Sequence, residues 1–354
     1  MKDSLYIALQ YIRYHRKKSL VLIACVVLIS ALPLIMQLLF SESERQLMAR
    51  ADATPLVIGS KGSALDLVMN TLYFSDEHPE PISMAAANRI DDSGLALPIP
   101  VYARFTARNL PIVGTSLDYF EFRNLQVAAG RPFGFVGECV LGAAAADKLE
   151  LQVGDSLVSS PETVFNIAGI YPLKMKIVGV LSPSYTADDL AVFTDIKTTW
   201  IIQGLGHGHQ DVTRLTDPTL VLSRSGGNVA ATAKLYQYNE ITEQNMDSFH
   251  FHGDTSVYPL SAVIAAPYDS KSGTILRGRF LGKDEQLQIV KPSETITRLL
   301  ETIFRIKNVL DAVVLIDAIA TLLALVLDFT LSQRLRSREV ETIFRIGCSR
   351  LTIA

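Results

Sequence analysis

Residues Leu20 to Phe40 read LVLIACVVLISALPLIMQLLF, with 18 apolar residues out of 21 and no charged one. An α-helix crosses the ~30 Å hydrocarbon layer of a membrane with about 20 residues, so this stretch predicts a transmembrane helix. A cleaved signal peptide is the alternative, because basic residues precede the run. Its apolar core would be only about 7–15 residues long, however, and would end at small residues. The length of the run favours an uncleaved span.

A second apolar stretch, Val309 to Leu331, has 18 apolar residues out of 23 and predicts a second span. Three aspartates lie in it. Asp311 and Asp328 are close to the membrane surfaces, whereas Asp317 would lie at a depth where a carboxylate is costly. We expect the Asp317 carboxyl to face a partner helix, protonated or hydrogen-bonded. A place in a proton or ion path is the alternative.

The composition agrees with two spans and a large water-soluble part. The chain has 354 residues, of which 49% are hydrophobic and 19% charged, and its mean hydropathy is +0.26. Without the two apolar stretches the composition is that of an ordinary globular protein. These values exclude a fully soluble protein, a channel made only of helices, a disordered chain and a collagen-like one.

The charges on either side of the spans predict the orientation. Residues 1–19 carry a net charge of +4 and residues 332–354 one of +3, so both ends are predicted to be cytoplasmic. Residues 41–308 carry a net charge of −7, and such an acidic outer region disfavours nucleic acid as a partner. We therefore expect a multi-pass protein of the plasma (inner) membrane, with its large domain in the periplasm or outside.

The outer region alternates short apolar runs with turn residues, which is typical of an α+β domain. Strands are predicted at Pro55–Ile58, Ile99–Phe105, Pro111–Val113, Met175–Leu181, Leu190–Phe193 and Thr219–Leu222, and helices at Ala64–Leu72, Ala143–Leu149 and Val229–Tyr238. Gly204 to Asp211 is interpreted as a loop between two subdomains. Cys139 is the one cysteine of this region, so no internal disulfide is expected and a hydrophobic core must stabilise the domain.

Helical patterns flank the outer region on both sides. Ser41 to Arg50 predicts a polar continuation of the first span. Lys291-Pro292-Ser293-Glu294 predicts a helix start with Ser293 as N-cap, and neither Gly nor Pro follows until Gly347. We therefore expect one helix from about residue 293 to 346, a stalk-like rod ~80 Å long that includes the second span.

Residues Arg336 to Arg350 read RSREVETIFRIGCSR. This segment resembles the R-x-R-E-(I/V)-x-x-x-x-R-x-(I/L)-G-(A/C)-S segment of MacB/FtsX-like ABC transporter permeases of the mechanotransmission type. Further segments resemble the same family in the same order: Gly114–Phe120 (GTSLDYF), Ala129–Phe133 (AGRPF), Val140–Gly142 (VLG), Leu151–Leu157 (LQVGDSL) and Ile177–Leu181 (IVGVL).

The resemblance implies a MacB-like periplasmic core domain between two transmembrane helices, with two more spans after them. The expected organisation is 1–19 cytoplasmic helix, 20–40 first span, 41–292 core domain, 293–308 stalk helix, 309–331 second span and 332–354 coupling segment. Because the sequence stops at Ala354, we expect a chain that is truncated before the last two spans. A relative of this kind would form a homodimer or a paired permease and bind two ATPase subunits.

The coupling segment would dock on the ATPase. The candidate docking residues are Arg338, Glu339, Arg345, Gly347 and Ser349, on a charged cytoplasmic helix where Gly347 lets the chain turn. The alternative is a basic flank that only orients the span.

Motifs for enzymatic chemistry are absent. Gly273 and Gly278 have the spacing of a phosphate-binding loop, but Arg279-Phe280 follow where Lys-Ser/Thr is required. No GxSxG, HExxH or CxxC occurs. We expect a chain that is not an enzyme and holds no cofactor of its own, with ATP and Mg²⁺ bound by the partner ATPase.

Two histidine pairs are the one sequence pattern that could bind a metal ion. His207 and His209 form one HxH pair, and His250 and His252 form another. On a strand, positions i and i+2 face the same side, so either pair could bind Zn²⁺ or Cu²⁺ with Asp211 or Asp254 as a third ligand. Exposed histidines on a loop and a strand are the alternative.

The sequence thus predicts a permease subunit that converts ATP-driven motion of its partners into movement of the outer domain. Export, lipoprotein release and control of a cell-wall hydrolase all remain open, and the histidine pairs would favour a metal-linked task. The alternative is a two-span sensor or ligand-binding membrane protein without an ATPase.

Overall fold

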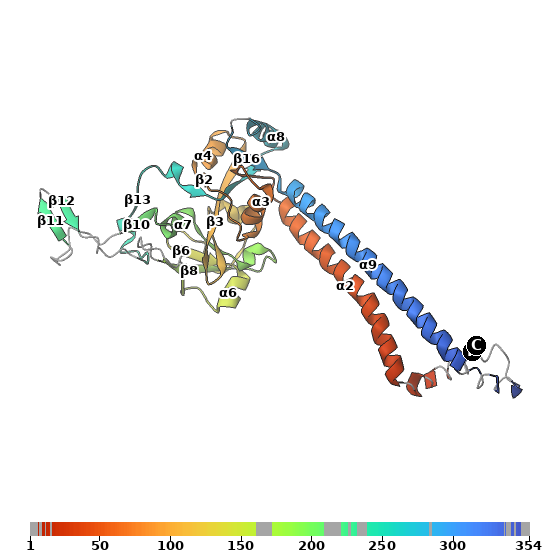
Figure 1. Ribbon diagram of the computed structural model, residues 1–354. Coiled ribbons are helices and arrows are strands. Elements are labelled where there is room, and N and C mark those ends of the chain that lie inside the picture. Colours follow the sequence, from red (N-terminus) through yellow and green to blue (C-terminus); the bar gives the residue numbers. More distant parts are fainter. Residues whose placement is uncertain are drawn as a thin grey trace. The chain divides into compact units, whose positions relative to one another are not determined.

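The computed structural model describes residues 6, 9–10, 12–14, 16–160, 172–208, 221–225, 228–231, 239–282, 285–335, 337, 341–342 and 345–347. The chain forms two compact units. One comprises Gln46–Thr297, and the other comprises Met1–Arg45 together with Arg298–Ala354. Two long helices have residues in both units: α2 (Arg16–Asp52) and α9 (Pro292–Leu335), coloured red and blue in Figure 1.

Helix α9 carries the apolar stretch predicted as the second span. Among the described residues, one helical stretch is long and apolar enough to cross a membrane, Pro292–Leu327, and none of its most apolar part is buried in protein. Asp317 is exposed on this helix. The first predicted span is helical and belongs to α2, but a two-span arrangement is not confirmed and stays a prediction.

The N-terminal end of α9 differs from the prediction in its capping residue. Pro292 is the first helical residue, and the amides of Glu294 and Thr295 both donate to the carbonyl of Lys291. Ser293 is therefore not the N-cap, because proline with its fixed φ and missing N–H takes the first position of the helix. Towards the C-terminus, α9 is continuous to Leu335, and residues 337, 341–342 and 345 are helical as well.

The unit Gln46–Thr297 is built on one mixed sheet in the order β16-β1-β15-β3-β4-β9-β6-β8-β5, with β7 added beside β8. Pairs β4·β9 and β6·β8 are parallel, and the other neighbours are antiparallel. The strands of this sheet are β1 (Leu56–Ser60), β3 (Ala96–Ala107), β4 (Leu110–Thr115), β5 (Val127–Gly130), β6 (Glu138–Leu141), β7 (Ser156–Val158), β8 (Lys174–Leu181), β9 (Val192–Asp195), β15 (Ala262–Pro267) and β16 (Leu287–Val290).

In the described part of the chain, three small sheets of two strands each accompany the large one. They pair β2 (Ile82–Ser83) with β14 (Pro259–Leu260), β10 (Gly206–Gly208) with β13 (Phe249–Phe251), and β11 (Val221–Ser225) with β12 (Asn228–Ala231). The helices of this unit are α3 (Ala64–Tyr73), α4 (Ala85–Asp92), α5 (Asp118–Arg123), α6 (Ala143–Leu149), α7 (Ile196–Ile202) and α8 (Ser270–Arg279), with 3₁₀ turns η1 (Ala187–Leu190), η2 (Met246–Ser248) and η3 (Thr255–Val257) (Figure 1).

Local chemistry explains several element ends. The two-residue turn between β3 and β4 is Arg108-Asn109, and both residues have positive φ, as a type I′ hairpin turn requires. Ser63 accepts a hydrogen bond from the amide of Asp66 and so caps α3. Asp195 caps α7 in the same way through the amide of Lys197.

The core lies between the sheet and the helices packed on it. Helix α4 contacts β3 and β15, and α7 contacts β3, β4 and β9. The largest fully buried side chains include Trp200 of α7, Tyr102 of β3, Ile112 of β4 and Leu141 of β6. Burial of such apolar surface is the main source of stability for a domain without disulfides.

The structure confirms the mixed α/β character and most predicted segments. Helices α3 and α6 lie where helices were predicted, and β1, β3, β4, β8 and β9 overlap the predicted strands. The helix predicted at Val229–Tyr238 is wrong for its first residues, which belong to β12, and residues 232–238 lie outside the described part of the chain. Gly206–Gly208, predicted as part of a loop, is a strand because it pairs with β13.

Candidate functional site

Arg50 holds the last turn of α2 in the core of the unit Gln46–Thr297, which is the predicted outer domain. Its guanidinium forms a two-pronged ion pair with Asp188 of η1, at 2.7 Å from Nη1 to Oδ2 and 2.8 Å from Nη2 to Oδ1. Nη2 also donates to the hydroxyl of Tyr119 at 2.9 Å, and Nε donates to the carbonyl of Leu72. Arg50 thus connects α2 to three separate elements of the domain.

The partners of Arg50 are bonded to one another as well. The Tyr119 hydroxyl donates to Oδ1 of Asp188 at 2.8 Å, and the Thr54 hydroxyl donates to the carbonyl of Arg50 at 2.9 Å. Close by, the Tyr73 hydroxyl donates to the carbonyl of Leu47 in α2 at 2.6 Å. Planar guanidinium groups suit such fixed, multiply bonded geometry better than a lysine ammonium does.

Burial makes this ion pair sensitive to the loss of either member. The side chains of Arg50 and Asp188 are 6% and 2% exposed. Burial works against the charge of Asp188, but the Arg50 guanidinium holds the pKa of that carboxyl below its usual range. Burial raises the pKa of Tyr119 to about 12, so its hydroxyl stays protonated and donates a hydrogen bond to Asp188.

The family-like motifs around residues 129–142 have structural roles. A Cβ on Gly130 would lie 2.1 Å from the carbonyl oxygen of Val178, and one on Gly142 would lie 2.2 Å from that of Asp188. Both glycines therefore permit a close approach of two backbones. Arg131 forms a two-pronged ion pair with Glu138, at 2.8 and 2.5 Å, which closes the loop before β6.

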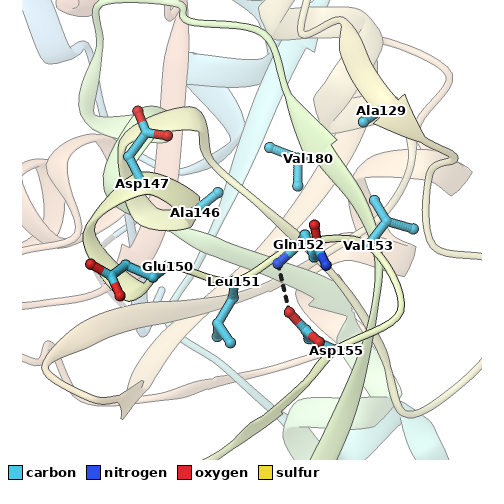
Figure 2. A pocket seen from close by; sticks show the side chains of 9 residues that line it. All are labelled: Ala129, Ala146, Asp147, Glu150, Leu151, Gln152, Val153, Asp155 and Val180. Carbon is cyan, nitrogen blue, oxygen red and sulfur yellow. Dashed lines mark hydrogen bonds between the residues drawn. The ribbon is translucent and has the colours of Figure 1, made fainter.

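A cavity of about 720 Å³ opens beside α6 (Figure 2). Its lining residues include the carboxylates of Asp147, Glu150 and Asp155 and no basic side chain. Asp155 accepts a hydrogen bond from the amide of Gln152 at 2.9 Å, so its carboxylate stabilises the turn before β7 (Figure 2). Nothing in this arrangement defines a ligand.

The structure brings three of the four predicted metal-binding histidines together. His207 of β10 lies opposite His250 of β13 in the ladder, and the Nε2 atoms of His207 and His252 are 3.3 Å apart. One ligand atom of each ring lies within 4.8 Å of the others. His209 and Asp211 lie outside the described residues. Asp254 caps η3 through the amide and hydroxyl of Ser256 and does not belong to the cluster.

The predicted ATPase-docking residues are described only in part. Nη2 of Arg345 donates to Oε1 of Glu341 at 2.6 Å, a pairing one helical turn apart, and Gly347 has φ +104°. Such a positive φ is typical of the residue that ends a helix. Arg338, Glu339 and Ser349 lie outside the described residues.

Sequence reasoning did not find the Arg50 anchor. Tyr119 belongs to a segment quoted for its family resemblance, whereas neither Arg50 nor Asp188 carried a recognisable signal. Arg50 is one of two arginines in a polar helix end, and its partner is 138 positions away. Only the folded sheet brings these residues together.

In the sequence, the mixed α/β domain lies between a long N-terminal helix and a long C-terminal helix that is apolar enough to cross a membrane, as expected for a membrane-anchored protein with a folded domain. Residues 20–236 match the model of the MacB-like periplasmic core domain, and the chain belongs to this family. The match confirms the resemblance to MacB/FtsX-like ABC transporter permeases that the sequence motifs predicted.

Solved structures with similarity to the chain include a periplasmic region and an extracellular domain. The periplasmic region of MacB from Actinobacillus actinomycetemcomitans is 15% identical, with 70% of this chain and 92% of that chain covered and a TM-score of 0.37. The extracellular domain of the noncanonical ABC-type transporter YknZ from Gram-positive bacteria is 13% identical, with 66% and 98% covered and a TM-score of 0.36.

A domain of a putative permease from Porphyromonas gingivalis is 12% identical to the chain, with 67% of this chain and 87% of that chain covered and a TM-score of 0.29. No curated protein matches the chain significantly.

Proposed function

We propose that the chain is a permease subunit that performs no catalytic step itself and couples ATP hydrolysis by a partner ATPase to movement of its outer domain. Membership of the MacB-like family supports this proposal. The observation that carries it is the anchoring of α2, which continues from the predicted first span into the outer domain and ends in the buried Arg50–Asp188 ion pair.

In this proposal both chain ends lie in the cytoplasm and the unit Gln46–Thr297 lies on the other side of the inner membrane. The charges of residues 1–19 and 332–354 support this orientation through the positive-inside rule. The subunit works as a homodimer or as one half of a paired permease. ATP and Mg²⁺ are bound by the ATPase.

The segment 332–354 is the proposed contact with the ATPase. Arg338, Glu339, Arg345, Gly347 and Ser349 supply charge and a turn at the end of a cytoplasmic helix. When the ATPase subunits close, a force on this segment acts on α9, whose 44 residues form one helix without a break. Rigid helices transmit such displacements with little loss because their backbone hydrogen bonds resist bending.

The Arg50 anchor determines what a movement of α2 does to the outer domain. A displacement of α2 along its axis acts on η1 through Asp188, on α5 through Tyr119 and on the end of α3 through Leu72. Separate elements are then displaced together, as in a rigid-body motion. The cargo can be a lipoprotein, an exported compound or a regulated cell-wall enzyme.

Co-purification tests the proposal. The full chain, expressed in its native membrane, is expected to retain an ABC ATPase that carries a Walker A motif and hydrolyses ATP. The variants Arg338→Ala and Glu339→Ala are expected to lose it, whereas Arg305→Ala, which removes one exposed positive charge from α9 outside the segment 332–354, is expected to retain it. A chain that reaches the membrane and binds no ATPase would instead support a two-span sensor.

A further inference from the structure

Three histidines gather on one side of the small sheet formed by β10 and β13. The ring centroids of His207, His250 and His252 are 4.9–5.0 Å apart in all three pairs. His207 is partly exposed, and the other two are exposed. The cluster belongs to the unit Gln46–Thr297 and shares no residue with the Arg50 anchor or with the predicted ATPase contact.

The local sequence fixes this arrangement. Strand β10 reads Gly-His-Gly and strand β13 reads Phe-His-Phe, and they pair with His207 opposite His250. A Cβ on Gly206 would lie 2.6 Å from the ring of Phe251, and one on Gly208 would lie 2.6 Å from that of Phe249. The phenylalanine rings therefore cover the glycines on one face, and strand alternation places the histidines on the other.

The covered face is packed against the core. Phe251 contacts Trp200 edge-on at 6.2 Å between ring centroids, and Trp200 contacts Tyr258 at 5.0 Å. The Tyr258 hydroxyl donates to the carbonyl of His252 at 2.9 Å, and Trp200 Nε1 donates to the carbonyl of Pro259 at 2.8 Å. This packing holds the backbone of the histidine cluster in place, so the three rings converge without having to be drawn together by a ligand.

One pair of ring nitrogens has the spacing of ligands on a metal ion, and a ligand atom of the third histidine lies within 4.8 Å of both. Ligand nitrogens about 2.0–2.1 Å from a tetrahedral ion lie roughly 3.3 Å from each other, and the Nε2 atoms of His207 and His252 are 3.3 Å apart. His250 Nδ1 lies 3.0 Å from the carbonyl oxygen of Ser248 and therefore donates to it, which leaves Nε2 as the atom with a lone pair. Metal-binding histidines commonly donate their second nitrogen to a carbonyl in this way.

We propose that His207, His250 and His252 bind one divalent transition-metal ion, with Zn²⁺ as the ion that fits best. Three neutral imidazoles suit zinc, copper and nickel, and zinc accepts three protein nitrogens with a water at the fourth position. Residues 207 and 250 are far apart in the sequence. The bound ion would therefore cross-link β10 and β13 and close the loop of chain between them. Closing such a segment stabilises the folded state relative to the unfolded one.

The test uses the full chain in detergent with an affinity tag that contains no histidine. Isothermal titration with Zn²⁺ is expected to show one ion bound per chain, and Co²⁺ is expected to give the intense visible absorption of a tetrahedral complex. His252→Ala and His207→Ala should each weaken Zn²⁺ binding at least about tenfold, since loss of a direct ligand costs no less than loss of an outer partner. The matched control is His78→Ala, which removes an exposed histidine of the same unit.

A second variant distinguishes loss of a metal ligand from a folding defect. His252→Gln keeps the length of an exposed side chain, and fluorescence of the single tryptophan, Trp200, reports whether the core beneath the cluster is intact. Folded His252→Gln protein with at least about tenfold weaker Zn²⁺ binding supports the site. Equal Zn²⁺ binding by the wild type and the His207→Ala, His250→Ala, His252→Ala triple variant overturns it, and so does a loss of binding in His78→Ala of the same size.

Discussion

Arg50 in the last turn of α2 and Asp188 in η1 are 138 positions apart in the sequence and form a buried ion pair with a shortest distance of 2.7 Å. The pair attaches a helix predicted to leave the membrane to the core of the outer domain. Exposed ion pairs contribute little to stability, whereas removal of one member of a buried pair leaves an uncompensated charge. The anchor is therefore the point at which stability and the proposed transmission of movement depend on the same contacts.

Replacement of Arg50 by methionine should destabilise the outer domain strongly. The buried Asp188 carboxylate would lose its partner, which typically costs about 3–5 kcal/mol. For a domain of this size the melting temperature should fall by roughly 10 °C. Fluorescence of Trp200, the single tryptophan and a buried residue, measures the transition.

The control for Arg50→Met lies on the same helix. Arg45 pairs with Glu42 at 2.8 Å, but their side chains are 76% and 44% exposed. Arg45→Met should therefore change the free energy of unfolding by less than about 0.5 kcal/mol. Equal destabilisation by the two substitutions would show that the effect comes from α2 in general and not from the buried pair.

Stability should fall in acid partly because of Asp188. Its pKa in the folded domain is below the ordinary value of 3.8, so its contribution is fully present above that pH and is lost as the pH falls through the folded value. The free energy of unfolding should therefore decrease below about pH 4. Urea titrations at several pH values measure this slope, and Asp188→Asn should make it shallower. An unchanged slope in the variant would contradict the assignment.

Gly142→Ala should destabilise the domain, because its Cβ would lie 2.2 Å from the carbonyl oxygen of Asp188. Backbone atoms cannot move aside as a flexible side chain can, so we expect a loss of about 1–3 kcal/mol. Gly62→Ala is the matched control, since nothing lies within 4 Å of its added Cβ. Thermal melts of the two variants compare them, and a tolerated Gly142→Ala would show that η1 is free to shift.

Cys139 should not react with maleimides in the folded protein. The residue is fully buried in β6, and burial raises the pKa of its thiol, so the reactive thiolate does not form at neutral pH. Labelling of the Cys25→Ser, Cys348→Ser chain should be negligible before denaturation and complete after it, as measured by mass spectrometry. Rapid labelling of the folded chain would show that β6 opens.

Patterns that depend on neighbouring residues were predictable from the sequence. The short apolar run Ile99–Phe105 and the helical pattern of Ala64–Leu72 predicted β3 and α3, because local spacing and side-chain type determine such elements. Val229 was predicted to start a helix, but the residues from Asn228 to Ala231 pair with β11, and strand pairing outweighed helical propensity.

Contacts between distant segments were not predictable. The two HxH pairs were visible in the sequence, but the ladder that sets His207 opposite His250 depends on Phe249 and Phe251 packing over two glycines. The partner of Arg50 could not be inferred either, since no local pattern relates α2 to η1. Both clusters arise from tertiary packing between segments that are far apart in the sequence. No short-range spacing of residues reveals such contacts.

The most direct test of the proposed coupling measures movement of the outer domain in the complex with the partner ATPase. Spin labels are attached at Tyr268→Cys, a position 65% exposed, in a chain that also carries Cys25→Ser and Cys348→Ser. In the proposed dimer, the distance between the two labels should differ between the nucleotide-free and the vanadate-trapped ATPase. In the Glu339→Ala chain, which is expected not to bind the ATPase, adding ATPase and nucleotide should leave the distance unchanged. Identical distances in both states, while ATP is hydrolysed, would contradict the account.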